Sequence, residues 1–173
     1  MKRLPLPVLL VLLSLVFVAA CGYRVLGSEP VAAGVRPKLA IPLFTNRSSE
    51  VGLEAIFANA LIRVFSRSRV TQVTAMEKQA DLILQGHVQK VESSSLAYQD
   101  IDRSLVRRVT LTVDLTLKER QGGQVLWKEM QVITADYVVN PNYHYGEATR
   151  KESIRRAAAD LAQRVHDKIL MIL

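Results

Sequence analysis

The stretch R-V-T-L-T-V-D-L-T-L-K, residues 108–118, carries the clearest pattern in the chain. The side chains of one set are apolar and stand at every second position: Val109, Leu111, Val113, Leu115 and Leu117. The side chains between them are polar: Arg108, Thr110, Thr112, Asp114, Thr116 and Lys118. Because successive side chains of a strand point to opposite faces, this period of two predicts an antiparallel strand with one face buried and the other face toward water.

Two further strands are predicted beside this one. A Gln-Gly-Gly turn suits a tight hairpin, after which residues 125–137 return as the next strand. The alternation slips near Lys128 and Glu129, which predicts a β-bulge there. Upstream, alternating residues over 81–98 predict another strand, joined to the central one by a turn over residues 99–104.

Residues 53–65 predict an amphipathic helix. Apolar side chains recur there at spacings of three and four: Leu53, Ile56, Phe57, Ala60, Leu61, Val64 and Phe65. Such a stripe indicates a helix of roughly five turns packed on a sheet. Ser48 or Ser49 is the expected N-cap, with Glu50 in the first turn, where the helix dipole favours an acid.

A second, longer helix is predicted at the C-terminal end. Thr149 and Glu152 match the capping box, in which each side chain bonds the other's backbone N–H, so we expect the helix to begin there after a loop over 135–145. Its apolar face is the set Ile154, Ala157, Ala158, Leu161, Val165, Ile169 and Ile172. This face is expected to cover the same sheet as the first helix.

The order of these elements predicts the fold class. Residues 38–44 form an expected first strand, which Pro42 places at an edge or ends, and residues 70–74 can form a short strand. Strand, helix, strands and helix in this order indicate an α+β fold with a single, mainly antiparallel or mixed, four-stranded sheet covered by two helices. We expect one such domain over residues 38–173.

Residues 1–20 predict a secretory signal peptide. Two basic residues precede an apolar run over 8–18, and two alanines end it. As a helix this run spans about 16 Å, whereas a bilayer core needs roughly 20 residues. Removal after export is therefore expected, with an uncleaved anchor as the alternative.

Cys21, the single cysteine of the chain, stands directly after the two alanines, as in the bacterial lipobox. Cys21 is therefore predicted to be the lipidated first residue of the mature protein, anchored stably by several acyl chains. A buried core cysteine is the less favoured alternative. Residues 21–37 read as a tether. Gly22 in place of an aspartate favours the periplasmic face of the outer membrane.

The charge balance narrows the choice of partners. The whole chain has 23 basic and 16 acidic residues, and the leader contributes two of the basic ones, so the mature charge is +5. This excess favours anionic partners such as phosphate-bearing lipid or an acidic protein surface, while an exported protein is not expected to bind nucleic acid. With one thiol, no disulfide can form within the chain.

No catalytic, metal or cofactor motif is present in the sequence. His87, His144 and His166 lack a second ligand at metal spacing, and there is no nucleophile elbow, phosphate loop or dinucleotide fingerprint. Asp100 and Asp102 lie in the expected turn, where acids commonly bond the local backbone. We expect no cofactor and no enzyme activity, with a lipid-anchored enzyme as the remaining alternative if a cleft gathers titrating groups.

Basic residues around the central strand are the candidate ligand contacts. Arg103, Arg107 and Arg108 gather near the turn before it, while Lys118 and Arg120 lie near the turn after it, at the other end of the sheet. Guanidinium groups bind phosphate in two-point geometry, as the head of a phosphorylated glycolipid requires. The alternative is that these charges only keep a strand face solvated and discourage edge pairing.

Several short motifs, taken in order, give the chain a family resemblance. They are Cys21-Gly22-Tyr23, the run K-L-A-I-P-L-F-T-N-R over 38–47, Gly52 to Ile56 at the first helix, Leu126-Trp127 after the hairpin, and the final helix. Together they resemble LptE, the lipopolysaccharide-assembly lipoprotein. This resemblance implies a lipoprotein that sits in the lumen of the β-barrel LptD as a plug, assists assembly of the barrel and binds lipopolysaccharide.

The resemblance also bears on the binding residues. It implies basic residues on loops at one end of the sheet, and Arg103 occupies one such place. The loop before the last helix has no lysine or arginine until Arg150, so it lacks the second cation. Two other kinds of lipid-anchored interaction module, those of a secretion pore and of a peptidoglycan synthase, start with a similar run and remain alternatives.

Overall fold

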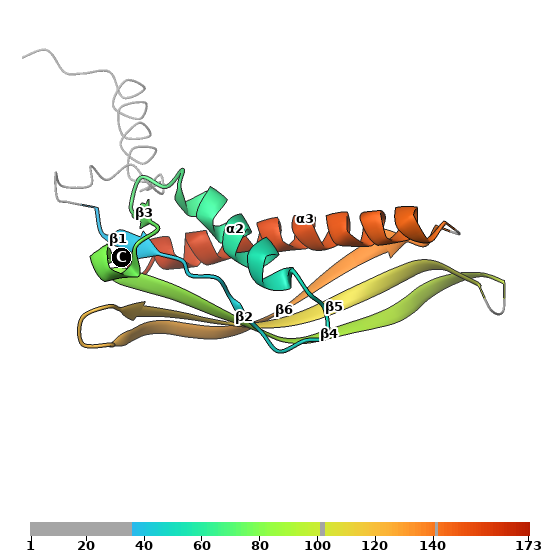
Figure 1. Ribbon diagram of the computed structural model, residues 1–173, viewed down its shortest axis with the longest axis horizontal. Helices are drawn as coiled ribbons and strands as arrows, with labels where there is room; N and C mark the ends of the chain where they lie inside the picture. The colour runs from blue at the N-terminus through green and yellow to red at the C-terminus, as the bar shows by residue number, and fades with distance from the viewer. Residues whose placement is uncertain (1–35, 101–102, 141) are drawn as a thin grey trace, which may run out of the picture. The chain divides into compact units, whose positions relative to one another are not determined.

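The computed structural model describes residues 36–100, 103–140 and 142–173, with the backbone alone over 97–100 and 103–105 (Figure 1). From Arg36 onward the described chain forms one compact unit. The predicted signal peptide 1–20, the lipidation site Cys21 and nearly all of the tether 21–37 lie outside the described residues.

One mixed sheet contains all the described strands. They are β1 (Lys38–Ala40), β2 (Thr45–Asn46), β3 (Gln72–Thr74), β4 (Leu82–Asp100), β5 (Arg103–Glu119) and β6 (Val125–Val138). The order is β3-β1-β4-β5-β6, and β2 also pairs with β4. The pairs of β1 with β3 and of β1 and β2 with β4 are parallel, whereas β4, β5 and β6 form antiparallel ladders.

The expected four-stranded sheet is therefore wrong in its strand number. The run expected as one strand is divided at Pro42, which lacks the backbone N–H that a ladder needs, so β1 ends at Ala40 and β2 begins at Thr45. The short strand β3 then joins the same sheet beside β1. The α+β class, the mixed sheet and the two long helices are confirmed.

The structure confirms the predicted central strand, β5, and its buried face. Val109, Leu111, Val113, Leu115 and Leu117 are all fully buried. The predicted turn over 99–104 is too wide, because β4 and β5 stay paired as far as Asp100 and Arg103. The long β4–β5 hairpin extends to one end of the sheet, as Figure 1 shows.

The β-bulge in β6 lies at Leu126 and not at Lys128 and Glu129. Leu117 pairs with Trp127, while Lys118 pairs with Val125, which leaves one extra residue between them. The pattern misleads because Glu129 is a polar residue on the face of the sheet that the helices cover. There it accepts hydrogen bonds from Trp127 Nε1, at 3.1 Å, and from the Gln131 amide.

The first helix, α2 (Leu53–Phe65), is shorter than expected, with 13 residues. Its N-cap is Gly52, whose φ of 95° suits glycine, so the predicted serine caps are wrong. Instead, the Ser48 hydroxyl donates to Asn46 Oδ1 at 2.7 Å. The Glu54 carboxylate accepts a hydrogen bond from the Gly52 N–H at 3.1 Å. A side chain of the first turn, and not a serine, therefore bonds the backbone of the N-cap residue.

The last helix, α3 (Tyr143–Leu170), begins six residues before the predicted capping box. Asn142 is its N-cap, and its side chain accepts from the His144 N–H at 3.1 Å. Thr149 lies inside the helix, where its hydroxyl donates to the Gly146 carbonyl at 2.8 Å. The earlier cap extends the helix upstream, so the predicted loop over 135–145 contains the end of β6 and the start of α3.

Both helices cover the same face of the sheet (Figure 1). The apolar stripes of α2 and α3 and the odd-numbered residues of β5 form one hydrophobic core. Near its centre, Phe44 packs against Phe57, with 6.2 Å between the ring centroids. Phe44 also covers Gly86 of β4 so closely that a Cβ atom there would lie 2.0 Å from the ring. A short 3-10 turn, η1 (Glu77–Gln79), precedes β4.

Candidate functional site

The predicted arginine cluster does not form a single surface. Arg107 and Arg108 are neighbours on β5, so their side chains lie on opposite faces of the sheet. Arg108 is on the face away from the helices, where its Nε and Nη2 each donate to the Asp136 carboxylate at 2.7 Å. These hydrogen bonds raise the pKa of Arg108 and lower that of Asp136. Arg108 is therefore already paired.

Arg107 is on the face that the helices cover, in line with the buried Val109. In the strand register, Arg107 is opposite Ser95 of β4 and Tyr137 of β6. The Nε atom of Arg107 is buried and has no hydrogen-bond partner among the described residues. A buried N–H without a partner is costly, so this guanidinium is better suited than Arg108 to bind an added acceptor.

A hollow of about 280 Å³ lies between the end of β6 and the first half of α3. We call it the β6–α3 hollow. It is lined by Val106, Asp136, Tyr137, Val138, Thr149 and Arg156. Arg107 does not line it, but follows the lining residue Val106 in sequence and is opposite the lining residue Tyr137 in the sheet. The valines and the tyrosine ring give the hollow apolar walls, Arg156 supplies its one lining guanidinium, and the lining carboxylate of Asp136 is paired with Arg108. Apolar walls with a few convergent polar groups suit an amphiphile that carries phosphate.

The remaining predicted site residues are only partly placed. Arg103 begins β5 opposite Asp100, at the hairpin end of the sheet, and only its backbone is described. Lys118 and Arg120 lie toward the opposite end, at the turn between β5 and β6, as predicted. Cys21 is outside the described residues.

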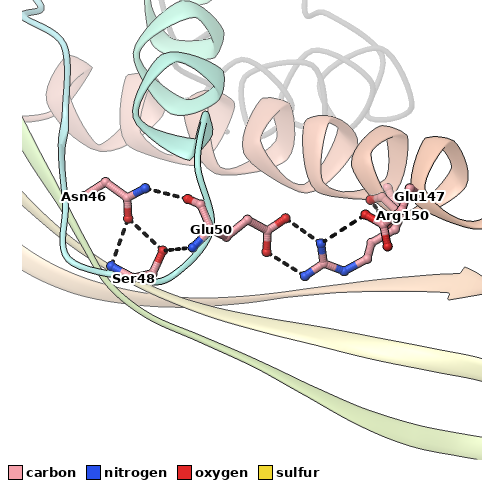
Figure 2. Close-up of polar contacts among 6 residues, drawn as sticks. Asn46, Ser48, Glu50, Glu147 and Arg150 are labelled. Atoms are coloured by element: carbon pink, nitrogen blue, oxygen red, sulfur yellow. Dashed lines mark hydrogen bonds and ion pairs between the residues drawn. The ribbon is translucent and has the colours of Figure 1, made fainter. Parts of the chain in front are cut away.

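A link between the loop before α2 and the helix α3 was not predicted (Figure 2). Arg150 donates from Nη1 and Nη2 to the two carboxylate oxygens of Glu50, each at 2.5 Å. The side chains of Arg150 and Glu50 are only 16% and 23% exposed, and the hydrogen bonds that Arg150 donates to Glu50 raise the pKa of Arg150. The Asn46 amide holds the same loop by donating to the Glu50 carbonyl at 2.6 Å. Arg150 directly follows Thr149, which lines the β6–α3 hollow, so the link ties this part of α3 to the loop before α2.

The histidines have structural partners. His87 contacts Thr45 across the sheet, His144 packs against Tyr143, and His166 contacts Ser68. Within the described ranges, no group of three or more His, Cys, Asp or Glu side chains could hold a metal ion. In that same part of the chain, no helix has the length and apolar character needed to span a bilayer.

Solved structures with a similar fold come from distant proteins. A protein from Xanthomonas campestris matches 83% of this chain and 90% of its own, with a TM-score of 0.57 and 12% identity. A hypothetical protein from Chlamydia trachomatis matches 79% of this chain and 96% of its own, with a TM-score of 0.54 and 10% identity. At these identities the likeness concerns the fold alone. No curated protein sequence matches the chain.

The sequence profile of the family LptE, described as Lipopolysaccharide-assembly, matches residues 37–169. That range includes every described strand and most of α3. The chain therefore belongs to the LptE family.

Proposed function

We propose that this chain is an outer-membrane lipoprotein, anchored through Cys21 on the periplasmic side, that occupies and helps to assemble an LptD-type β-barrel and binds lipopolysaccharide. The observation that carries this proposal is the family match over residues 37–169. Members of this family have no enzymatic role, and we propose none for this chain.

The open face of the sheet supports a place inside a barrel. Over β5 and β6, no described helix covers this face (Figure 1). It presents a row of threonines with a few exposed apolar side chains: Thr110, Thr112, Thr116, Thr134, Met130 and Val132. The interior of a large transmembrane barrel is polar and hydrated, so a threonine-rich surface of this kind is compatible with it.

The β6–α3 hollow supports the lipopolysaccharide part of the proposal. Arg156 lines the hollow, and Arg107, next to the lining residue Val106 in sequence, has a buried Nε with no hydrogen-bond partner among the described residues. We propose that both guanidinium groups bind the phosphates of the glycolipid. Arg103 stays a predicted contact, whereas Arg108 has to break its pair with Asp136 before it can bind.

The barrel is tested by purifying the tagged, lipidated chain from outer membranes in mild detergent and identifying what co-elutes. A large β-barrel protein in equal amount is the expected result. Recovery of a secretion pore, of a peptidoglycan synthase or of no protein at all would contradict the proposal and favour the corresponding alternative.

The glycolipid site is tested separately with the double variant Arg107→Gln/Arg156→Gln. A hydrogen bond to a charged group contributes about 1.5–3 kcal/mol, so lipopolysaccharide binding should weaken at least about tenfold. Lys128→Gln/Arg164→Gln, which removes two exposed cations elsewhere, is the matched control and should bind as the parent does. If the barrel still co-purifies while both variants bind lipopolysaccharide normally, the site is misplaced although the partner is right.

A further inference from the structure

A second hollow, of about 520 Å³, lies near the C-terminal end of α2. It is lined by Arg36, Ser66, Ser68, Thr71, Gln72 and Val73. We call it the Arg36 hollow. Its lining residues Gln72 and Val73 belong to β3, which pairs with β1: Gln72 is opposite Lys38, and the Gln72 N–H donates to the Pro37 carbonyl at 3.0 Å. Neither the family match nor the proposed function assigns a role to it.

The Arg36 hollow is lined by polar side chains, and only some of them have hydrogen-bond partners among the described residues. The Ser66 hydroxyl donates to the Ile62 carbonyl at 2.6 Å, and the Ser68 hydroxyl accepts from the Val70 N–H at 3.2 Å. The Thr71 hydroxyl is different, because Thr71 is only 3% exposed and its Oγ1 has no partner among the described residues. Buried polar groups normally have a partner in the protein or in a bound molecule.

Three further arginines are close in sequence to the lining residues Ser66 and Ser68. Arg67 and Arg69 flank the lining residue Ser68, and Arg63 lies four residues before Arg67 on the exposed side of α2. Neither these three nor Arg36 makes an ion pair among the described residues. We call these four arginines with the Arg36 hollow the anchor-side face.

Acidic side chains are nearly absent from the segments that build the anchor-side face. The sequence has no aspartate or glutamate over residues 30–49 or 59–76. Two acids reach the lining through one intervening residue. Asp167 contacts His166, which contacts Ser68, and the Asp81 carboxylate accepts from the Lys38 N–H at 2.7 Å, next to the lining residue Gln72 in the sheet. Neither carboxylate forms an ion pair with the four arginines in the described part of the chain, so positive charge predominates in these segments.

We propose that the anchor-side face binds the headgroups of anionic glycerophospholipids at the surface of the bilayer. Arginine and hydroxyl groups together suit a phosphodiester, and clustered cations are attracted to an anionic membrane surface. Arg36 follows the predicted lipidation site Cys21 by only fifteen residues, which span at most about 50 Å when fully extended. The tether therefore limits how far this face can lie from the bilayer. The proposal needs neither the barrel nor lipopolysaccharide.

The test uses residues 21–173 with Cys21→Ser, so that acyl chains cannot hold the protein on the membrane. The chain is sedimented with vesicles of phosphatidylglycerol and phosphatidylcholine, or of phosphatidylcholine alone, at low ionic strength. Binding to the anionic vesicles only is expected. Each basic residue near such a surface contributes roughly fivefold to binding, so Arg36→Gln/Arg67→Gln/Arg69→Gln should weaken it by roughly 100-fold.

The control Lys128→Gln/Lys151→Gln/Arg164→Gln removes the same charge from exposed positions elsewhere and should lose much less binding. An equal loss in both triple variants would overturn the proposal, because net charge alone would then explain the attraction. Binding of inorganic phosphate without binding to anionic vesicles would also overturn it and would reveal a site for free phosphate. Lipopolysaccharide binding by the anchor-side variant should stay unchanged, which keeps this test distinct from that of the β6–α3 hollow.

Discussion

Gly86 provides the sharpest test of how the core is packed. It lies on the helix-facing side of β4, opposite Leu115, and Phe44 packs directly over it. A Cβ atom at this position would lie 2.0, 2.2 and 2.4 Å from three carbons of the Phe44 ring. Optimal separations of carbon atoms are about 3.5–4.0 Å, so in Gly86→Ala the ring has to move by roughly 1.5 Å.

The ring has little room for such a movement. Phe44 is 3% exposed and stacks on Phe57, which is itself 1% exposed. Overpacking of a well-packed core costs typically about 1–3 kcal/mol, and a displacement of this size belongs at the upper end. For a domain of this length, about 3 kcal/mol of destabilisation lowers the melting temperature by roughly 10 °C.

Thermal and urea unfolding of the Cys21→Ser chain measure this effect. Gly146→Ala is the control, since its Cβ atom would have only an ordinary contact, 3.5 Å from the Asn140 carbonyl, and it lies within a helix. This control should be neutral or should stabilise by up to about 1 kcal/mol. Phe44→Leu supplies the second control, because a smaller side chain leaves space for the new methyl group.

Gly86→Ala in the Phe44→Leu background should therefore cost less than about 1 kcal/mol, as expected for a coupled pair of neighbours. A melting temperature of Gly86→Ala within about 2 °C of the parent would refute the packing argument. The same conclusion would follow if the full penalty persisted in the Phe44→Leu background.

Two ion pairs lead to further predictions. Glu50→Gln leaves the mostly buried Arg150 without its carboxylate and should cost about 2 kcal/mol in unfolding free energy, whereas Glu147→Gln, half exposed and 3.9 Å away, should cost less than about 0.5 kcal/mol. The Arg108 side chain lowers the pKa of Asp136 in the folded protein, so this contribution to stability is complete above the ordinary aspartate pKa of about 3.9 and is lost as the pH falls through the lower folded value. NMR titration of the carboxyl carbon should show that lowered pKa, and an ordinary value would contradict the pairing.

The regular strands could be predicted because their signal is local. In β5 each apolar residue stands two positions from the next, and the hairpin glycines Gly122 and Gly123 have the positive φ angles that such a turn requires. The bulge in β6 was misplaced because Glu129 and Gln131 occupy helix-facing positions, where they bond to each other. In the sequence pattern such polar residues look solvent-facing, so the predicted bulge lies a few positions away from the one in the structure.

The contacts of the candidate site could not be predicted from local sequence patterns, because they join residues far apart in the chain. Glu50 and Arg150 are 100 residues apart, so only the packing of α3 beside the loop before α2 brings them together. The arginines of β5 could be identified as candidate contacts from the sequence. The alternation alone predicts that Arg107 and Arg108 lie on opposite faces of the sheet. The sequence could not indicate that Asp136 pairs with Arg108, while the buried Nε of Arg107 has no hydrogen-bond partner in the described part of the chain.

The two hollows lie toward opposite ends of α3. Thr149 and Arg156 line one of them, while His166 contacts Ser68 in the wall of the other. At about 1.5 Å per residue, the helix separates Thr149 from His166 by about 25 Å. Sites so far apart without shared partners should act independently. Variants that weaken phospholipid binding should therefore leave lipopolysaccharide binding unchanged, and variants that weaken lipopolysaccharide binding should leave phospholipid binding unchanged. In a chain held to the bilayer by its anchor-side face, the β6–α3 hollow would then lie about 25 Å along α3 from the residues that contact the headgroups and could bind a glycolipid at the same time.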